Sequence, residues 1–393
     1  MQPPYSLLFP AYLLHVIYCF LAIIWQILDG NSAGIDIFLT GIWQNITPGK
    51  SQKYYWKSRY ARVMALPMAL FFDGISALDC YRAMNLAGAS VGAPKRYARE
   101  FAASSPNLAS LKGARESFPS LVSPRLLVSE QSKRCRIQGV KCRVFGSPLP
   151  SEAFIFLGDD MYACSPAFAF TRSAVELDFA ELVLLGYEIT GSYRLDSNSE
   201  QGFFSAPPLV SHSALVSVSS QGNLPGANKA RNALRFVSSG SASPMETALA
   251  MLLSMPKAKG GYGLPSPQLN AAVEVPKGDW RVAYGRQFRC DLLWPTASLC
   301  VEYDSDMFHT GSQKIARDAR RRNALASLGF MVITATKNQV TSIPGLDQLA
   351  FQVAKGLGVR LRMERVNRKA QRALLDCAVG GSRSSRRASR ISQ

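Results

Sequence analysis

Two acidic residues in neighbouring apolar runs are the strongest candidates for chemistry in this chain, Asp291 and Glu302. Each run is typical of a buried strand, and the turn residues 295–297 join the two. An antiparallel hairpin would bring both carboxylates to the same end of a sheet, where they would repel each other. A divalent cation, Mg²⁺ or Mn²⁺, would relieve this repulsion and could activate water against a phosphodiester. The alternative is that Asp291 only caps a turn at a strand end.

An acidic stretch follows Glu302 directly, which is unusual in a chain with so many basic residues. It contains Asp304 and ends at His309. A histidine can act as a general acid or base near neutral pH, so His309 is a second candidate for the catalytic site. The alternative is a hydrogen-bonded histidine in a surface loop.

A helix is expected over about 313–328, and it carries polar residues within its apolar stripe. Asp318 and Arg321 share a face with apolar residues, because positions three or four apart are neighbours on a helix. Such residues are expected to point at the site, where Asp318, Arg321 and Lys314 would support it. Arg321 could bridge a carboxylate or contact a DNA phosphate. A solvated basic face with an internal Asp318–Arg321 pair is the alternative.

The elements around these residues predict an α/β (α+β) domain with a mixed sheet. Three strands in succession, then a crossover helix and a fourth strand, favour four strands flanked by helices. The expected order is a helix over 244–255, strands over 280–286, 288–295 and 298–304, a helix over 313–328, a strand over 330–336 and a helix over 344–356.

The order and spacing of these residues resemble a known family. The chain resembles the very-short-patch-repair (Vsr)-like endonucleases of the PD-(D/E)-x-K superfamily. The residues that carry the resemblance are Asp291, the run Val301-Glu302-Tyr303-Asp304, His309, Asp318-x-x-Arg321-x-x-x-Leu325 and Leu328-Gly329-Phe330. The resemblance extends from Pro244 to about residue 357 and implies a restriction-endonuclease-like fold. It implies that Asp291 and Glu302 bind metal, with Asp304 and His309 as further site residues. Glu246 matches a glutamate that supports the metal site from the first helix.

The chain departs from that family at two positions. Asp304 stands where the superfamily has a lysine, and Ser305 replaces a usual glycine. The role of activating water is therefore open to His309, Lys314 or Arg321. Two functions follow as expectations: an Mg²⁺-dependent DNA endonuclease in repair, restriction or phage defence, or an inactive DNA-binding regulator or antitoxin of a toxin–antitoxin system.

A separate α+β domain is expected over residues 64–195. A short strand and a helix that Asp73 or Ser76 could cap open it, and a helix from Ser165-Pro166 to about Leu185 closes it, with Gly186 as its stop. Short segments resemble AbiEi-type antitoxins, which implies DNA binding or a protein partner. The other expected parts are an apolar leader over 1–63, a linker and connecting helix over 196–240, a nuclease-like domain over 241–360 and a basic, partly disordered tail over 361–393.

Charge and cysteine content limit the function classes. The formal net charge of +18 suits a polyanionic partner, which we expect to be DNA. The eight cysteines are scattered without a close pair, as is typical of reduced thiols in a cytoplasmic protein.

Residues 5–28 carry no formal charge and are long enough for a membrane helix. Basic residues follow that segment and would place the rest of the chain in the cytoplasm. The alternatives are a buried helix, which Pro10 would break, or a true start at Met64 or Met68. A membrane partner is expected only if this segment is translated.

Overall fold

The computed structural model describes residues 69–277, 286–304 and 312–380, with only the backbone given for 312–318. The chain divides into two compact units, Met1–Leu66 and Pro67–Gln393, and the described residues belong to the second. The apolar segment 5–28 therefore lies outside the described residues. Within the described part of the chain, no helix is both long and apolar enough to cross a membrane.

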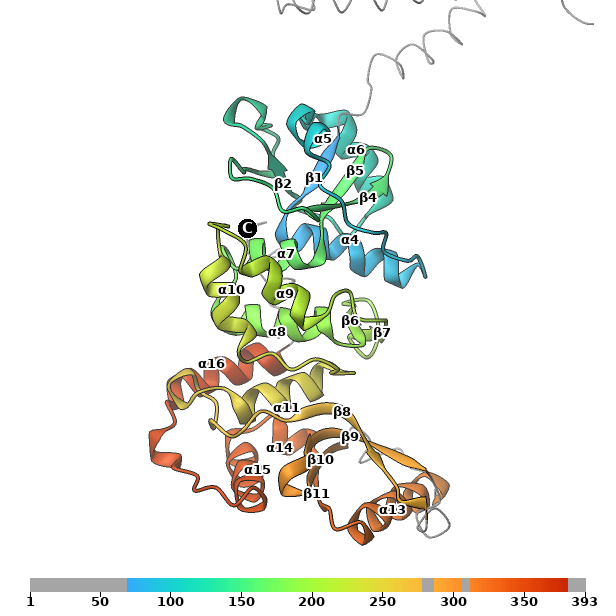
Figure 1. Ribbon diagram of the computed structural model, residues 1–393, viewed down its shortest axis with the longest axis vertical. Coiled ribbons are helices and arrows are strands. Elements are labelled where there is room, and N and C mark those ends of the chain that lie inside the picture. Colours follow the sequence, from blue (N-terminus) through green and yellow to red (C-terminus); the bar gives the residue numbers. More distant parts are fainter. Residues whose placement is uncertain (1–68, 278–285, 305–311, 381–393) are drawn as a thin grey trace, which may run out of the picture. The chain divides into compact units, whose positions relative to one another are not determined.

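A five-stranded sheet forms the first part of the second unit among the described residues (Figure 1). Its strand order is β3-β2-β1-β5-β4, with β1 parallel to β5 and antiparallel to β2. The strands are β1 (Leu70–Phe72), β2 (Arg125–Val128), β3 (Lys141–Val144), β4 (Phe154–Gly158) and β5 (Met161–Cys164). The helices around them are α4 (Gly74–Leu86), α5 (Ala98–Ala103), α6 (Leu108–Ser117) and α7 (Pro166–Ser173). The expected α+β class of this part of the chain is confirmed.

The helix expected from Ser165-Pro166 to about Leu185 is two helices in the structure. Helix α7 ends at Ser173, and α8 (Phe179–Thr190) begins after Asp178, whose side chain accepts a hydrogen bond from the Glu181 N–H in a reciprocal capping box. Gly186 does not stop α8. A Cβ at that position would lie 2.7 Å from Cγ2 of Val237, so Gly186 permits close packing instead.

Asp73 precedes α4 but does not cap it with its side chain. Its carboxylate instead accepts two hydrogen bonds of 2.9 Å from the Arg172 guanidinium on α7. Both side chains are almost fully buried, at 1% and 4% exposure. A buried charge needs such a partner, and this one comes from an element far away in the sequence.

Residues 196–240, expected to be a linker with a connecting helix, are largely ordered and packed. They form β7 (Phe203–Ser205), α9 (His212–Ser219) and α10 (Ala227–Leu234), and β7 pairs with β6 (Tyr193–Leu195). Leu215, Ala230 and Leu234 are buried in the same hydrophobic core as the preceding elements. The connecting helix predicted near 227–237 is confirmed as α10.

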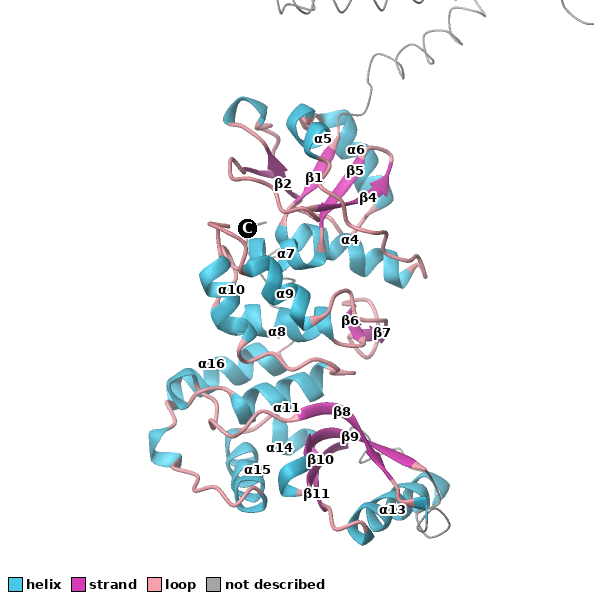
Figure 2. Ribbon diagram, in the orientation of Figure 1, coloured by secondary structure: helices cyan, strands magenta, loops and turns pink. Residues whose placement is uncertain are grey.

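The second sheet has four strands in the described residues, in the order β11-β10-β9-β8. Strands β8, β9 and β10 are antiparallel in succession, and β11 is parallel to β10, so the expected mixed sheet is confirmed (Figure 2). The strands are β8 (Gln268–Glu274), β9 (Gln287–Trp294), β10 (Leu299–Asp304) and β11 (Met331–Thr336). The sequence did not indicate β8, and almost all of the strand expected over 280–286 lies outside the described residues.

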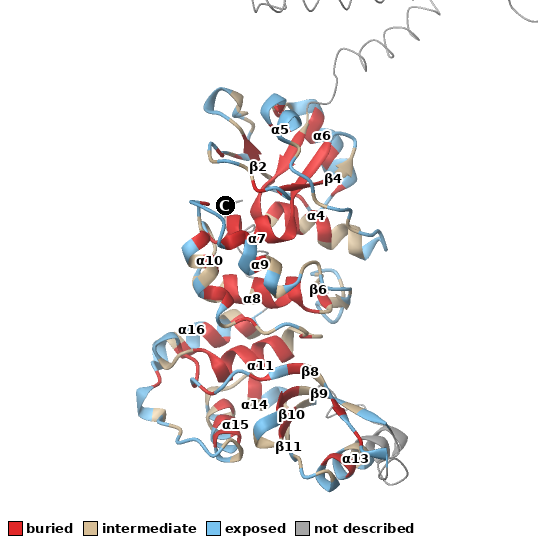
Figure 3. Cartoon of the chain, viewed as in Figure 1, coloured by how far each residue is buried: buried red, intermediate tan, exposed pale blue. Residues whose placement is uncertain are grey.

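The three helices expected beside this sheet are confirmed as α11 (Pro244–Ser254), α13 (Ser312–Ser327) and α15 (Ile343–Gly356). Two further helices, α14 (Lys337–Val340) and α16 (Arg368–Val379), were not predicted. Helix α11 is buried from Glu246 to Ser254 and contacts α8, β9 and α16 (Figure 3). The basic, partly disordered tail expected from residue 361 instead contains a packed helix, α16. Its residues Leu374, Leu375 and Ala378 are buried.

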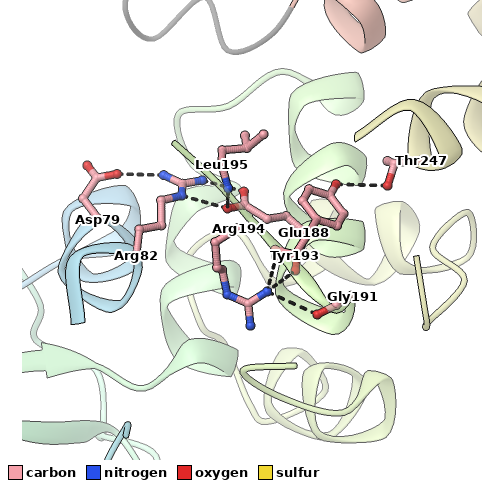
Figure 4. A network of polar contacts seen from close by, with 8 residues as sticks. All are labelled: Asp79, Arg82, Glu188, Gly191, Tyr193, Arg194, Leu195 and Thr247. Atoms are coloured by element: carbon pink, nitrogen blue, oxygen red, sulfur yellow. Dashed lines mark hydrogen bonds and ion pairs between the residues drawn. The ribbon is translucent and has the colours of Figure 1, made fainter. Parts of the chain in front are cut away.

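A network of polar side chains joins α4, α8, β6 and α11 (Figure 4). The Arg82 guanidinium donates to both carboxylate oxygens of Glu188, at 2.8 and 2.6 Å, and to Asp79 at 2.7 Å. The Tyr193 hydroxyl lies 3.0 Å from Oγ1 of Thr247 on α11. Arg194 is fully buried and donates to backbone carbonyls, including that of Glu188 at 2.8 Å.

Candidate functional site

The four-stranded sheet separates into two arms between β9 and β10. Their ladder runs from the Leu299–Trp294 pair to the Val301–Leu292 pair and ends there. Beyond this pair, β9 continues to pair with β8, and β10 continues to pair with β11 as far as Asp304. The next residue on each strand past the last pair is a carboxylate, Asp291 on β9 and Glu302 on β10.

Asp291 fills the gap between the two separating strands. Its Oδ2 accepts a hydrogen bond of 2.8 Å from the Tyr303 N–H of β10, in place of a ladder carbonyl of β9. The carboxylate is partly buried. Asp291 therefore does more than cap a turn, since its carboxylate is held at the point where the strands separate.

Glu246 reaches the same region from the first turn of α11. Ser243 is the N-cap residue, and its Oγ accepts from the Glu246 N–H at 3.2 Å. The Glu246 carboxylate accepts from the Ala242 N–H at 2.8 Å, from Ser243 Oγ at 3.0 Å and from Asn270 Nδ2 at 2.5 Å. Asn270 lies on β8, so Glu246 ties the start of α11 to the sheet.

The three carboxylates are electrostatically coupled. Burial and the charge of Asp291 raise the pKa of Glu302 from its usual 4.5 to about 7, although the Cys300 thiol and Arg321 oppose this shift. Burial also raises the pKa of Asp291, against the Tyr303 N–H bond and Arg321. Burial and the charge of Asp291 raise the pKa of Glu246. Ionisation of these acids is therefore unfavourable, and a bound cation would favour their charged forms.

Among the side chains that the structure describes, the Arg321 guanidinium on α13 bonds to this site. Its terminal nitrogen lies 2.8 Å from Glu302 Oε2 and 3.0 Å from Oε1, and it also donates to the Arg289 carbonyl. The Arg321 side chain is 36% exposed, whereas that of Glu302 is 15% exposed. The prediction that Arg321 bridges a carboxylate is confirmed, and its exposure leaves it accessible to a ligand in solvent.

Two cysteines that the sequence did not single out lie beside Glu302. Cys290 and Cys300 are fully buried, and their sulfur atoms lie with a Glu302 oxygen all within 4.8 Å of one another. The Cys300 thiol donates to Glu302 Oε1 at 3.0 Å. One signal was available in the sequence: Cys300 and Glu302 are two apart on a strand and so share a face. Recognising Cys290 required the hairpin register, which spacing alone did not give.

The remaining predicted residues are placed less closely or not at all. Asp304 is exposed at the end of β10, where its backbone pairs with Thr336. His309 lies outside the described residues. Lys314 and Asp318 lie on α13, but their side chains are outside the part of the chain that the structure describes. The structure thus places Asp291, Glu302 and Arg321 where β9 and β10 separate, with Glu246 near enough for the charge of Asp291 to raise its pKa. The carboxylate oxygens of the three acids do not all lie within 4.8 Å of one another, as the ligand atoms of Cys290, Cys300 and Glu302 do.

Comparison with known proteins gives relatives without an assigned activity. Two curated proteins from two strains of Mycobacterium tuberculosis, each described as an uncharacterised protein, are 30% identical to this chain over 135 residues. The match covers 34% of this chain and 44% of each relative, so the chain spans less than half the length of the curated relatives it matches. No family model matches the chain, and no solved structure matches it significantly. The geometry of the site is therefore the basis for any functional assignment.

Proposed function

We propose that the domain formed by α11, the four-stranded sheet and α13–α15 is a metal-dependent endonuclease that hydrolyses phosphodiester bonds of DNA. The observation that carries this proposal is the coupled group of carboxylates at the separation of β9 and β10. Glu246, Asp291 and Glu302 come from three different elements, and each has a pKa above its usual value. Acids from three elements that converge with raised pKa values are typical of functional sites.

Oxygen donors of this kind fit Mg²⁺ or Mn²⁺. Asp291 and Glu302 would hold the ion, and Glu246 would orient the site through Asn270, because its carboxylate already accepts three hydrogen bonds. The ion supplies the polarisation of the phosphate and the acidification of a bound water. Arg321 lies beside Glu302 and is partly exposed, so its guanidinium would contact a phosphate oxygen and stabilise the charge that develops there.

Basic residues from the last turn of α15 onward support a nucleic acid as the substrate. The described cations between residues 355 and 372 all have exposed side chains, and the whole chain carries a net charge of +18. Lys and Arg contacts to phosphates release condensed counterions, so affinity for DNA should fall steeply as salt rises. The residues of this surface are Lys355, Arg360, Arg362, Arg365, Arg368, Lys369 and Arg372.

The proposal is tested by incubating supercoiled plasmid with the full chain in the presence of Mg²⁺ or Mn²⁺. We expect the parent to cut, and Asp291→Asn and Glu302→Gln to cut at least about a hundredfold more slowly, because loss of the ion costs several kcal/mol in the transition state. DNA binding in Ca²⁺, measured by filter retention, should remain within about threefold. Glu116→Gln, at an exposed acid on α6 outside both the site and the basic surface, is the matched control and should cut like the parent.

Cleavage by the parent that neither substitution reduces would refute the assignment of Asp291 and Glu302. Absence of cleavage by the parent with both ions would favour a second function, a DNA-binding regulator or antitoxin. The Glu302–Arg321 ion pair supports that second candidate, because Arg321 partly neutralises the carboxylate without any metal. Asp304 at the position of the superfamily lysine supports it too.

A further inference from the structure

Glu302 is adjacent to two buried thiols, those of Cys290 and Cys300, on the side away from solvent. These sulfur ligands differ chemically from the carboxylate oxygens of Asp291. Cys300 and Glu302 are on the same face of β10, and Cys290 comes from the neighbouring strand β9. The two sulfur atoms and a Glu302 oxygen lie within 4.8 Å of one another. Thiolates are soft ligands that select zinc-like ions over Mg²⁺.

We propose that Cys290, Cys300 and Glu302 form a second metal site, which binds Zn²⁺ and shares Glu302 with the proposed Mg²⁺ site. Both cysteines are fully buried, whereas Glu302 is partly exposed, so an ion would enter past the carboxylate. Three protein ligands leave one position of a tetrahedral zinc ion open.

The separations fit zinc with small adjustments. Bonds of about 2.3 Å to sulfur and about 2.0 Å to oxygen hold the ligand atoms of a tetrahedral site roughly 3.4 to 3.8 Å apart. The Cys300 sulfur already lies 3.0 Å from Glu302 Oε1, and every separation is below 4.8 Å. Shifts of side-chain torsions suffice to reach zinc geometry, because the ligands lie on paired strands whose backbone is fixed.

The charges also balance. Binding would release one proton from each thiol, which leaves two thiolates and one carboxylate around a doubly charged ion. The remaining negative charge is matched by the Arg321 guanidinium, which lies 2.8 Å from Glu302 Oε2. A neutral group is the arrangement that a buried metal site requires.

Because Glu302 would serve both ions, zinc would compete with the proposed Mg²⁺ ion for this carboxylate. Zinc held by the cysteines would withdraw Glu302 from Asp291, and so would inhibit the proposed nuclease. This consequence rests on the proposed function, whereas zinc binding itself does not.

Metal binding is tested first without DNA, by titrating the reduced, EDTA-treated full chain with Co²⁺ as a spectroscopic substitute for Zn²⁺. We expect a thiolate-to-cobalt charge-transfer band that saturates at one equivalent and disappears when Zn²⁺ is added. The double variant Cys290→Ala/Cys300→Ala should lose the band, and circular dichroism should show that it folds, since alanine also suits a buried apolar position. Glu302→Gln should weaken Co²⁺ binding at least about tenfold.

Cys135 and Cys142 give a matched control, because their sulfur atoms lie 3.0 Å apart without the geometry of the proposed site. The variant Cys135→Ala/Cys142→Ala should retain the full band. A parent without the band, or a Cys290→Ala/Cys300→Ala variant that keeps it, overturns the proposal.

Regulation is tested separately, in the plasmid assay with Mg²⁺. Micromolar Zn²⁺ should inhibit the parent at least about tenfold more strongly than Cys290→Ala/Cys300→Ala. Equal inhibition of both proteins overturns the regulatory role while leaving the nuclease intact. A parent that fails to cut DNA but shows the cobalt band refutes the proposed function and not the zinc site.

Discussion

Buried acids in the two halves of the described unit have opposite electrostatic environments. Glu188 on α8 is paired with the Arg82 guanidinium through two hydrogen bonds, and Asp73 is paired in the same way with Arg172. Around the four-stranded sheet, Asp291 and Glu302 share Arg321 among the side chains that the structure describes, and Glu246 is held by neutral hydrogen-bond donors. The first arrangement neutralises each charge, and the second leaves charge unneutralised.

The pKa values follow this difference. Burial raises the pKa of Glu188, but the Arg82 guanidinium outweighs it, and the pKa lies below its usual value. Burial and Asp291 together raise the pKa of Glu302 to about 7. Burial alone therefore does not distinguish a structural acid from a functional one. What separates Glu302 from Glu188 is the neighbouring carboxylate of Asp291, whose charge adds to burial at Glu302 and outweighs Arg321.

The largest expected effect on the free energy of unfolding is at the buried ion pair of Asp73 and Arg172. Arg172→Met should lower the free energy of unfolding by about 3–5 kcal/mol, because it leaves the Asp73 carboxylate buried without a partner. Urea denaturation measures this change. The double variant Asp73→Asn/Arg172→Met should recover more than half of the loss. A loss below about 1 kcal/mol for Arg172→Met would mean that pairing is not what stabilises Asp73.

A smaller effect on the free energy of unfolding, of opposite sign, is expected at Glu302. The pKa of Glu302 is about 7 in the native state and about 4.5 when unfolded, so the carboxylate costs stability as pH rises through this window. In EDTA, Glu302→Gln should raise the free energy of unfolding by roughly 2–3 kcal/mol at pH 8 and by less than about 1 kcal/mol at pH 5. Thermal and urea unfolding at both pH values would measure this.

The exposed Glu364 provides the control, since Glu364→Gln should leave the pH dependence unchanged. Destabilisation by Glu302→Gln at pH 8 would show that Glu302 is neutralised like Glu188. The contrast between the two halves would then disappear.

The smallest effect is expected for an ion pair in solvent. Arg368 lies 2.8 Å from Asp347, but its side chain is 44% exposed. Arg368→Met should lower the free energy of unfolding by less than about 1 kcal/mol, and by still less in 1 M salt. A loss near that of Arg172→Met would show that burial does not set the strength of these pairs.

Local patterns predicted much of the fold around the site. Apolar runs bounded by turn residues identified β9, β10 and β11, and the helix expected over 244–255 is α11. The strand β8 was missed because Gln268–Glu274 lacks a clear alternation and is only partly buried. The break of α7 before α8 was also missed, although Asp178 and Glu181 have the spacing of a capping box.

The sequence predicted those parts of the candidate site that lie on neighbouring elements of the chain. Asp291 and Glu302 meet because their strands are adjacent in sequence, and Arg321 follows on the next helix. The partnership of Glu246 with Asn270 and the contact of Cys290 with Cys300 depend on strand register, which composition does not give. For the same reason the pairing of Asp73 with Arg172 could not be predicted, since the two residues stand 99 positions apart.

The separation of β9 from β10 depends on the side chains that occupy it. Past the last ladder pair, the Tyr303 N–H is taken by Asp291 and the Arg289 carbonyl by Arg321. Both residues therefore keep the strands apart, because they bond to backbone groups that could otherwise form further hydrogen bonds between β9 and β10. Removing either one would let the hairpin close further, so a loss of chemistry at this site would be accompanied by slower amide hydrogen exchange along β9 and β10.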